Sequence, residues 1–304
     1  SIFQTNTNLN HLTNSKKLYD TYYNTEYIKL AVSRLLKKDT NLFFSGRKKT
    51  CTPLISKTFT QVTTRFPSTN VQSYNCSKMG YSFSFPRGNR CYYGYTAQLY
   101  DRFKTITTCN IYIDVGANWG QTALPLIKNG WRVISFEPVF NTALGAAYNL
   151  YQNDISHDRG IIIPAAISNN TGTSTIYLPG DRDDNSAISS IAANLNIQKK
   201  LKKIQINTTR MDDFLSSVDQ NILNDVKLIK LDAQGHELLA LKGFGNLLGM
   251  YNFTFIIEND VNIQKAAKFT INAVEQYLSH YNYVSYCFLP NGKFVKSRAC
   301  YDNI

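Results

Sequence analysis

The sequence predicts an α/β protein built on a doubly wound sheet of seven strands, mostly parallel and ending in an antiparallel hairpin. From about residue 111 onward, short apolar runs alternate with helical stretches, which is the pattern of parallel strands joined by crossover helices. The order changes near the C-terminus, where two short runs flank the turn Pro290-Asn-Gly292 as in a hairpin. With 304 residues, 43% of them hydrophobic, the chain is long and apolar enough to bury such a core.

Three apolar runs separated by helical stretches predict the first half of the sheet. Residues 111–115 form a strand that ends in a glycine turn, and residues 122–129 form the helix that follows. The next strand, 132–136, leads into a helix over 141–152, and residues 161–167 form the third strand. Because each crossover helix returns the chain to the same end of the sheet, the three strands are expected to be parallel.

The second half begins with an excursion from this alternation. Residues 173–178 and 203–209 are predicted to be strands on either side of a polar loop, 180–190. The alternation of strand and helix then resumes and closes with the hairpin. These later elements are strand 226–232, helix 235–241, strand 253–258, helix 263–280 and the hairpin strands 281–289 and 293–297.

Residues 1–110 lack this alternation. Residues 16–38 are predicted to form an amphipathic helix, and residues 95–103 a second helix that leads into the sheet. The stretch between them is basic, aromatic and rich in Ser, Thr and Asn, with three prolines and no clear period. We therefore expect a basic N-terminal segment, residues 1–104, that caps the ligand-bearing edge of an α/β domain formed by residues 105–304.

The formal net charge of +12 lies entirely in residues 1–110, which hold sixteen Lys and Arg against four acidic residues. A basic front segment on a neutral body indicates an anionic partner, either nucleic acid, a membrane surface or an acidic glycan. The alternative is a solvated basic surface that aids solubility. No apolar run reaches the roughly 18 residues of a membrane span, so no transmembrane segment is predicted in this chain.

Six cysteines contain no C-x-x-C pair, so a zinc site is not expected. Four sequons for N-glycosylation occur, and one of them, at Asn252, heads a predicted core strand, which is a poor place for a glycan. An even number of cysteines together with sequons favours the lumen of the secretory pathway, with the cytoplasm as the alternative. The sequons are Asn75-Cys-Ser, Asn169-Asn-Thr, Asn207-Thr-Thr and Asn252-Phe-Thr.

The strongest functional signal is the loop after the first predicted strand, Ile113-Asp-Val-Gly-Ala-Asn-Trp-Gly-Gln-Thr122. Its glycines let the backbone approach a ligand closely, but their spacing is not the dinucleotide-binding G-x-G-x-x-G. An acid at the strand end suits a cationic or amine-bearing ligand better than a phosphate. The candidate ligand-binding residues of this loop are Asp114, Gly116, Asn118, Gly120, Gln121 and Thr122.

A second acid follows the next predicted strand, in Ser135-Phe-Glu-Pro138. Glu137 ends that strand, where a carboxylate can accept both hydroxyls of a ribose, and Pro138 lies beside it. An acidic, glycine-containing loop followed about 20 residues later by a strand-terminal acid is the arrangement expected for S-adenosylmethionine. The sequence therefore predicts S-adenosylmethionine as the cofactor.

The chain resembles the FkbM-type S-adenosylmethionine-dependent O-methyltransferases, which have the Rossmann-like class I methyltransferase fold. The resemblance covers about residues 105–298 and adds Ala166 to the candidate cofactor residues. It implies methyl transfer to a hydroxyl, commonly on a sugar or a glycosylated natural product. In the most specific block the family has a Val and a second acid where this chain has Ala233 and Gln234. The motifs that carry it are Asp114-Val-Gly-Ala-Asn-Trp-Gly120, Phe136-Glu-Pro138, Pro164-Ala-Ala-Ile-Ser168, Arg210-Met-Asp-Asp-Phe214, Leu228-Ile-Lys-Leu-Asp-Ala-Gln-Gly-His-Glu237, Leu241-Lys-Gly243 and Ile256-Ile-Glu258.

The candidate catalytic residues are Lys230, Asp232, His236 and Glu258. Strand alternation places Lys230 and Asp232 on one face, and Asp232 ends its strand where open α/β sheets bind ligands. A methyl sulfonium is already activated, so the enzyme needs alignment and a base near the acceptor hydroxyl, for which Asp232, His236 and Glu258 are candidates. Lys230 and Glu237 have a simpler interpretation as a buried pair that joins strand to helix.

We thus expect an O-methyltransferase that acts on a hydroxyl of a sugar, a glycan or a glycosylated product, with residues 1–104 in the acceptor site. One alternative is a ribose 2′-O-methyltransferase acting on RNA, with a lysine of the basic segment assisting Asp232. Another is a non-catalytic module that binds a glycan or a membrane. No metal is expected, because the acids of the loop 181–186 are crowded and lack a spaced partner.

Overall fold

The structure is a computed structural model of the chain. It describes residues 71–76, 81–86, 109–155, 159–179, 201–218, 220–258, 271–288 and 294–296.

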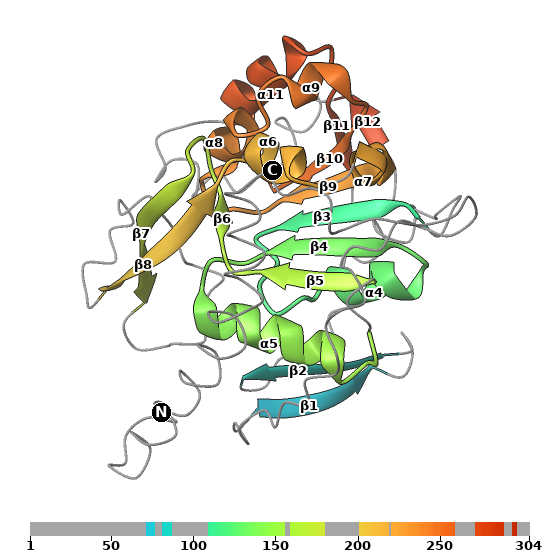
Figure 1. The fold of residues 1–304 in the computed structure, drawn as a ribbon, viewed down its shortest axis with the longest axis vertical. Helices are drawn as coiled ribbons and strands as arrows, with labels where there is room; N and C mark the ends of the chain where they lie inside the picture. Colours follow the sequence, from blue (N-terminus) through green and yellow to red (C-terminus); the bar gives the residue numbers. More distant parts are fainter. Residues whose placement is uncertain are drawn as a thin grey trace.

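The core is a parallel sheet of five strands in the order β10-β9-β3-β4-β5 (Figure 1). The doubly wound α/β fold with a C-terminal antiparallel hairpin is thereby confirmed. The described part of the chain does not place seven strands in this sheet, because β11 and β12 pair only with each other. The strands are β3 (Ile111–Val115), β4 (Arg132–Phe136), β5 (Gly160–Ile163), β9 (Val226–Leu231) and β10 (Thr254–Ile257), with the hairpin β11 (Tyr286–Phe288) and β12 (Phe294–Lys296).

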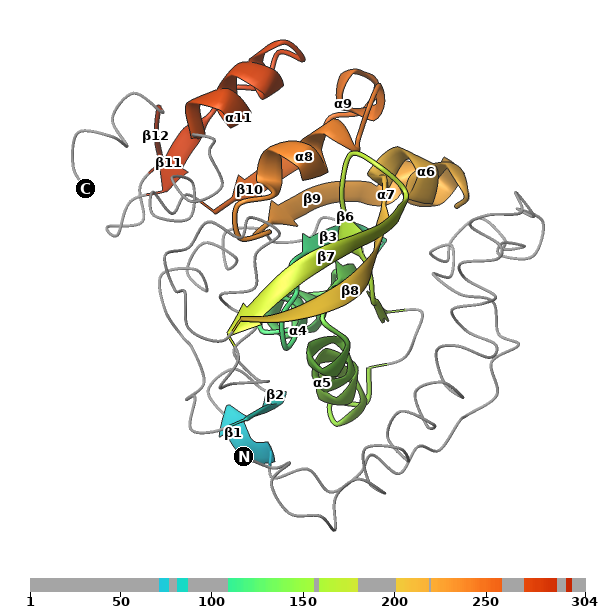
Figure 2. The ribbon, with the colours of Figure 1, turned by 90° about the vertical axis from the view of Figure 1, so that its left-hand side faces the viewer.

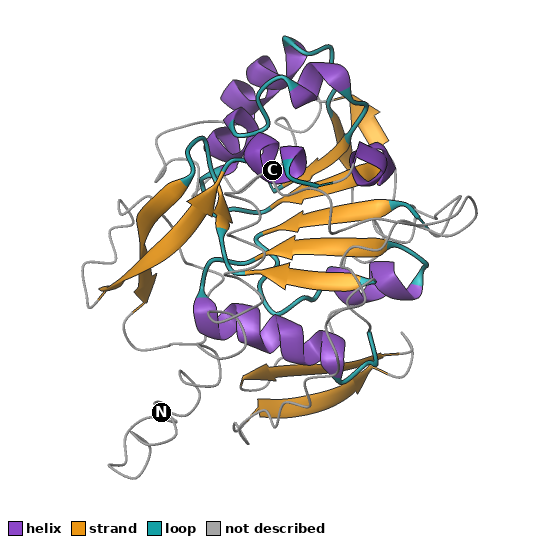
Figure 3. Cartoon of the chain, in the orientation of Figure 1, coloured by secondary structure: helices purple, strands orange, loops and turns teal. Residues whose placement is uncertain are grey.

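Alternation along the strands divides the core between the two faces of the sheet. Ile111, Ile113 and Val115 of β3 join one buried cluster, whereas Tyr112 joins the other. The helices follow the same division, so that each face of the sheet is covered (Figures 2 and 3). One face carries α4 (Ala123–Lys128) and α5 (Phe140–Tyr151), and the other carries α6 (Met211–Ser216), α7 (Gln220–Asp225), α8 (Glu237–Lys242), α9 (Leu247–Met250) and α11 (Ile271–Ser279).

A second sheet of three strands, β6-β8-β7, stands beside the edge to which the arrowheads of β3, β4 and β5 point (Figure 1). Its strands are β6 (Ala166–Ile167), β7 (Gly172–Pro179) and β8 (Leu201–Thr209). The single strand predicted over 161–167 is therefore wrong: β5 ends at Ile163 and β6 belongs to the second sheet. Pro164 lies between them and has no N–H to continue a ladder, which accounts for the break.

Of the N-terminal segment, only two strands are described, β1 (Val71–Cys76) and β2 (Tyr81–Pro86), which pair as an antiparallel hairpin. Phe83 of β2 is buried in the cluster that lies between the sheet and α5. This hairpin was not predicted from the sequence, although Tyr81-Ser-Phe-Ser-Phe85 alternates as a strand does. The predicted helices 16–38 and 95–103, and the cap they would form, lie outside the described residues.

At the opposite end of the sheet, the side chain of Arg132 connects the starts of three strands. Arg132, at the first position of β4, is 2% exposed. Its Nη2 donates to the carbonyl oxygen of Cys109 and to Oδ2 of Asp225, both at 2.9 Å. The guanidinium of Arg132 thus connects the segments that precede β3 and β9 to the first residue of β4.

Candidate functional site

Four acidic residues come together at the carboxyl edge of the central sheet. Asp114 lies near the end of β3, and Glu137, Asp232 and Glu258 directly follow β4, β9 and β10. The sheet ladder continues through the last three: their backbone N–H groups donate to the carbonyls of Ile163, Val115 and Leu231, at 3.0–3.1 Å. Because the strands are parallel, these residues lie on the edge where open α/β sheets bind ligands.

The loop between β3 and α4 turns back over this edge. The N–H groups of Gly116 and Ala117 both donate to the carbonyl of Phe136, at 2.9 and 3.0 Å. Gly116, Asn118 and Gly120 all have positive φ values, of 77°, 51° and 80°. A Cβ on Gly116 would lie 1.9 Å from the carbonyl oxygen of Asp232, so only glycine fits there. The loop predicted from sequence is therefore packed directly against the end of β9.

Asp114 is fully buried and holds this loop. Its Oδ2 accepts a hydrogen bond from Oγ1 of Thr122 at 2.5 Å, and Nζ of Lys230 lies 3.3 Å from its Oδ1. Both carboxylate oxygens therefore have partners within the protein. The assignment of Asp114 to the cofactor site stays a prediction.

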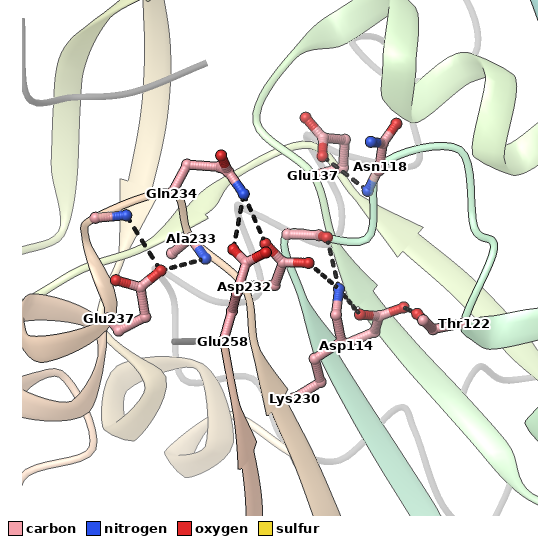
Figure 4. A network of polar contacts seen from close by, with 12 residues as sticks. Asp114, Asn118, Thr122, Glu137, Lys230, Asp232, Ala233, Gln234, Glu237 and Glu258 are labelled. Atoms are coloured by element: carbon pink, nitrogen blue, oxygen red, sulfur yellow. Dashed lines mark hydrogen bonds and ion pairs between the residues drawn. The ribbon is translucent and has the colours of Figure 1, made fainter. Parts of the chain in front are cut away.

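Lys230 connects the loop to the end of β9. Its ammonium lies 3.1 Å from the carbonyl oxygen of Gly116 and 3.1 Å from Oδ2 of Asp232, in addition to Asp114 (Figure 4). The predicted pair of Lys230 with Glu237 is not among these contacts. Glu237 instead accepts hydrogen bonds from the backbone N–H groups of Ala233 and Gly235, at 2.9 and 3.2 Å, and thereby stabilises the turn before α8.

Asp232 and Glu258 form a carboxyl pair bridged by Gln234. The amide nitrogen of Gln234 donates to Oδ1 of Asp232 at 2.9 Å and to Oε2 of Glu258 at 2.8 Å (Figure 4). The pKa of Glu258 is raised to about 8, first by desolvation, then by its hydrogen bond with Asp232 and that residue's charge. For Asp232, burial raises the pKa, but the charge of Lys230 and the hydrogen bonds from Glu258, Gln234 and Lys230 together lower it below its usual value. Glu258 therefore keeps the shared proton at neutral pH, and Asp232 keeps the negative charge.

Glu137 is 5% exposed and is held by the backbone on both sides. The N–H of Asn118 donates to its Oε2 at 3.0 Å, and the N–H of Val139 donates to its Oε1 at 2.8 Å. Burial raises the pKa of Glu137 to about 7, although these two hydrogen bonds act in the opposite direction. Each oxygen still has a lone pair for a further donor.

Two predicted site residues lie away from this polar network. Nε2 of His236 lies 3.0 Å from Oγ of Ser168, and burial lowers the pKa of the imidazole to about 4. The ring is therefore neutral at physiological pH and has a structural partner. Ala166 is buried in a small apolar cluster with Val139 and with residues of β7 and β8, so its side chain contributes to packing.

The sequence matches the model of the FkbM methyltransferase domain over residues 114–285, which is more than half of the chain. The chain belongs to the FkbM methyltransferase family. The match begins at Asp114 and includes Glu137, Lys230, Asp232 and Glu258, so the whole polar network lies within the family domain.

Among solved structures, the chain is similar to the methyltransferase FkbM from Methylobacillus flagellatus KT, with 18% sequence identity and a TM-score of 0.42. That similarity covers 62% of this chain and 42% of the other, so the chain spans less than half of the length of the solved relative. No curated protein matches the sequence.

Within the described part of this FkbM-family chain, no group of three His, Cys, Asp or Glu side chains is placed to hold a metal ion, and none of the helices is long and apolar enough to cross a membrane. The loop 181–186 lies outside the described residues. The bridging amide of Gln234 was not predicted from the sequence. Its signal was present, because Gln234 stands where the family motif has an acid.

Proposed function

We propose that this FkbM-family methyltransferase uses S-adenosylmethionine to methylate a hydroxyl of a sugar or glycan. The observation that carries the proposal is the carboxyl pair of Asp232 and Glu258, which lies at the same sheet edge as the glycine loop and Glu137. On one side of the edge, the glycine loop and Glu137 supply the groups that a nucleoside would need. On the other side, the carboxyl pair includes Glu258, which can accept a proton. The two sides share Lys230, which contacts both the loop and Asp232.

The residues of the donor side fit S-adenosylmethionine. Glu137 has one lone pair left on each carboxylate oxygen, which suits the two hydroxyls of a ribose. Gly116 and Gly120 have left-handed backbone conformations, which let the loop turn back over the sheet edge where a ligand would bind. When bound, this cofactor supplies a methyl group already activated by a positive sulfonium. Asp114, Asp232 and Lys230 together leave one negative charge in excess, which favours a cation nearby.

Glu258 is the proposed base. A general base works best when its pKa lies near the working pH, and the pKa of Glu258 is raised to about 8. Asp232, with its lowered pKa and three donors, is a weak proton acceptor and acts by keeping Glu258 in place. S-adenosylmethionine, when bound, would give up its methyl group to the acceptor oxygen and leave as S-adenosylhomocysteine, and Glu258 in its ionised form would take the hydroxyl proton. His236, neutral and bonded to Ser168, has no proposed part in this step.

The cofactor assignment is tested by isothermal titration with S-adenosylhomocysteine. Micromolar binding is expected, and its absence from correctly folded protein would overturn the assignment. Transfer is then measured with methyl-labelled S-adenosylmethionine and a panel of oligosaccharides. Glu258→Gln should keep the titration result and lose most of the transfer. Asp154→Gln, which likewise replaces a carboxylate by an amide at an exposed position after α5, is the control and should leave both unchanged.

The class of acceptor is tested by measuring methyl transfer at different ionic strengths. We propose that residues 1–104 contribute to acceptor binding, which is supported by the concentration of the net charge of +12 in residues 1–110. Transfer to a neutral glycan should change little between low and high ionic strength, whereas transfer to a sulfated or phosphorylated glycan should weaken. A much steeper loss, with RNA as the preferred acceptor, would replace the glycan by a ribose 2′-hydroxyl.

A further inference from the structure

Three of the four sequons have no part in methyl transfer, and the structure describes each of them. They occupy residues 169–171, 207–209 and 252–254, and the asparagine of each is exposed. The fourth, at Asn75, lies in β1 and its side chain is outside the described residues. A glycan extends into solvent, so exposure of the asparagine in the folded protein is the first requirement for such a site.

Asn207 lies on the outer face of the β7–β8 ladder. Its neighbours Ile206 and Thr208 are 5% and 4% exposed, so they face inward and Asn207 faces solvent. Its partner across the ladder, Thr173, is exposed as well. This hairpin stands at the front of the molecule in Figure 2. A sugar on Asn207 would therefore displace no buried side chain.

Asn252 also faces solvent, contrary to the expectation from sequence. The strand β10 begins only at Thr254, and Phe253 alone of the three sequon residues is buried. Because alternate residues point to opposite sides, Asn252 and Thr254 both point outward. The position at the head of a core strand thus leaves the asparagine accessible.

Asn169 lies in the exposed turn between β6 and β7. Its backbone carbonyl accepts a hydrogen bond from Nη1 of Arg210 at 2.9 Å, and its side-chain Oδ1 accepts one from Ser168 at 3.3 Å. Both bonds use oxygen atoms. The amide nitrogen, which is the atom that carries the sugar in a glycoprotein, takes part in neither.

The cysteines provide an independent observation about the compartment. Cys109 and Cys287 are both disulfide-bonded, and the described residues include no free cysteine. Disulfides form and persist in oxidising compartments such as the lumen of the secretory pathway. The same compartment supplies the activated sugar donor for asparagine.

We propose that Asn169, Asn207 and Asn252 are N-glycosylation sites in a chain that folds in an oxidising lumen. At each site the amide nitrogen forms a bond to the anomeric carbon of an oligosaccharide donated by a lipid diphosphate. The bond from that carbon to the diphosphate oxygen breaks, the lipid diphosphate leaves, and the amide loses one proton. The proposal is independent of the proposed function, since none of the three asparagines belongs to the polar network of Figure 4.

The test is peptide mass spectrometry of the full chain purified from the cells that make it. Peptide N-glycosidase in ¹⁸O-labelled water converts each glycosylated asparagine to labelled aspartate. Label at all three positions is the expected result, and an unlabelled asparagine overturns its own assignment. Free thiols at Cys109 and Cys287 in the unreduced protein, together with no label at any site, would overturn the lumenal assignment.

Variants of the chain expressed in secretory cells show which asparagine carries each glycan. Asn169→Gln should remove one glycan by gel mobility, whereas Asn170→Gln, at the neighbouring exposed residue, should keep it because the sequon remains. Thr254→Ala should remove the glycan of Asn252, and Thr254→Ser should retain it. Loss of a glycan in Asn170→Gln or in Thr254→Ser would contradict the assignment of that site.

Discussion

Gly116, which follows β3, and Asp232, which follows β9, are in direct backbone contact, although they lie 116 positions apart in the chain. A Cβ on Gly116 would lie 1.9 Å from the carbonyl oxygen of Asp232 and 2.9 Å from its carbonyl carbon. The loop proposed to hold the methyl donor is therefore packed directly against the strand end that carries Asp232. Lys230 reinforces this packing, because its ammonium contacts the carbonyl of Gly116 and the carboxylate of Asp232.

Gly116→Ala should separate the loop from β9. The added methyl group meets backbone atoms that cannot move aside, and the φ of 77° is itself unfavourable for alanine. We expect a loss of about 2–5 kcal/mol in the free energy of unfolding. Denaturant unfolding measures it. Gly249→Ala is the control, because its Cβ would have only ordinary contact with Tyr281, at 3.5 Å. Equal stability of the two variants would contradict the close packing of the loop.

Lys230→Met should destabilise the protein by about 3–5 kcal/mol at neutral pH, because it leaves two carboxylates of Asp114 and Asp232 without their cation. The pKa of Asp232 is lowered by Lys230, so the stabilisation is present above the unfolded pKa of an aspartate and disappears as pH falls. The difference between variant and wild type should therefore shrink toward acidic pH. Lys242→Met, at an exposed position of α8, is the control; a pH-independent difference would contradict this origin.

The strands β3 and β4 and the loop of the site were predictable because they depend on local patterns. The apolar runs of β3 and β4 and the acids that follow them are visible within a few residues. The break at Pro164 was equally local, and its effect on the third strand was underestimated. The alternation of Tyr81 to Phe85 was also local and was missed.

The contacts of Lys230 with β3 and the loop after it were not predictable in this way. They depend on the register of β9 against β3, in which Lys230 lies opposite Asp114. Glu237, which is closer in sequence, bonds to the backbone of its own turn instead. The bridge formed by Gln234 has the same origin, since Glu258 reaches it only through the pairing of β10 with β9.

Glu137→Gln should weaken S-adenosylhomocysteine binding by about 1–3 kcal/mol, the value of a lost charged hydrogen bond. In the wild type, hydroxyl donors on a ligand favour the ionised carboxylate and thus lower its pKa from about 7. Binding should therefore release a proton near neutral pH, and affinity should rise from pH 6 to pH 8 and then level off. Calorimetry in buffers of different ionisation enthalpy measures that proton. Glu137→Gln should abolish the release, and an unchanged release in the variant would assign it to another group.

Methyl transfer should increase as pH rises through about 8, because Glu258 must lose its proton to act as the base. Asp232 and, more weakly, Glu237 raise the pKa of its carboxyl, Lys230 lowers it, and the amide of Gln234 donates to it at 2.8 Å. Gln234→Glu replaces that donor by a third carboxylate, and like charges disfavour ionisation. The rising limb of kcat against pH should then move about one pH unit higher, while the affinity for S-adenosylhomocysteine stays the same. Gln276→Glu, the same substitution at an exposed position of α11, should leave the limb in place. If Gln234→Glu and Gln276→Glu gave the same profile as the wild type, the proton would leave the acceptor by a route that does not include Glu258.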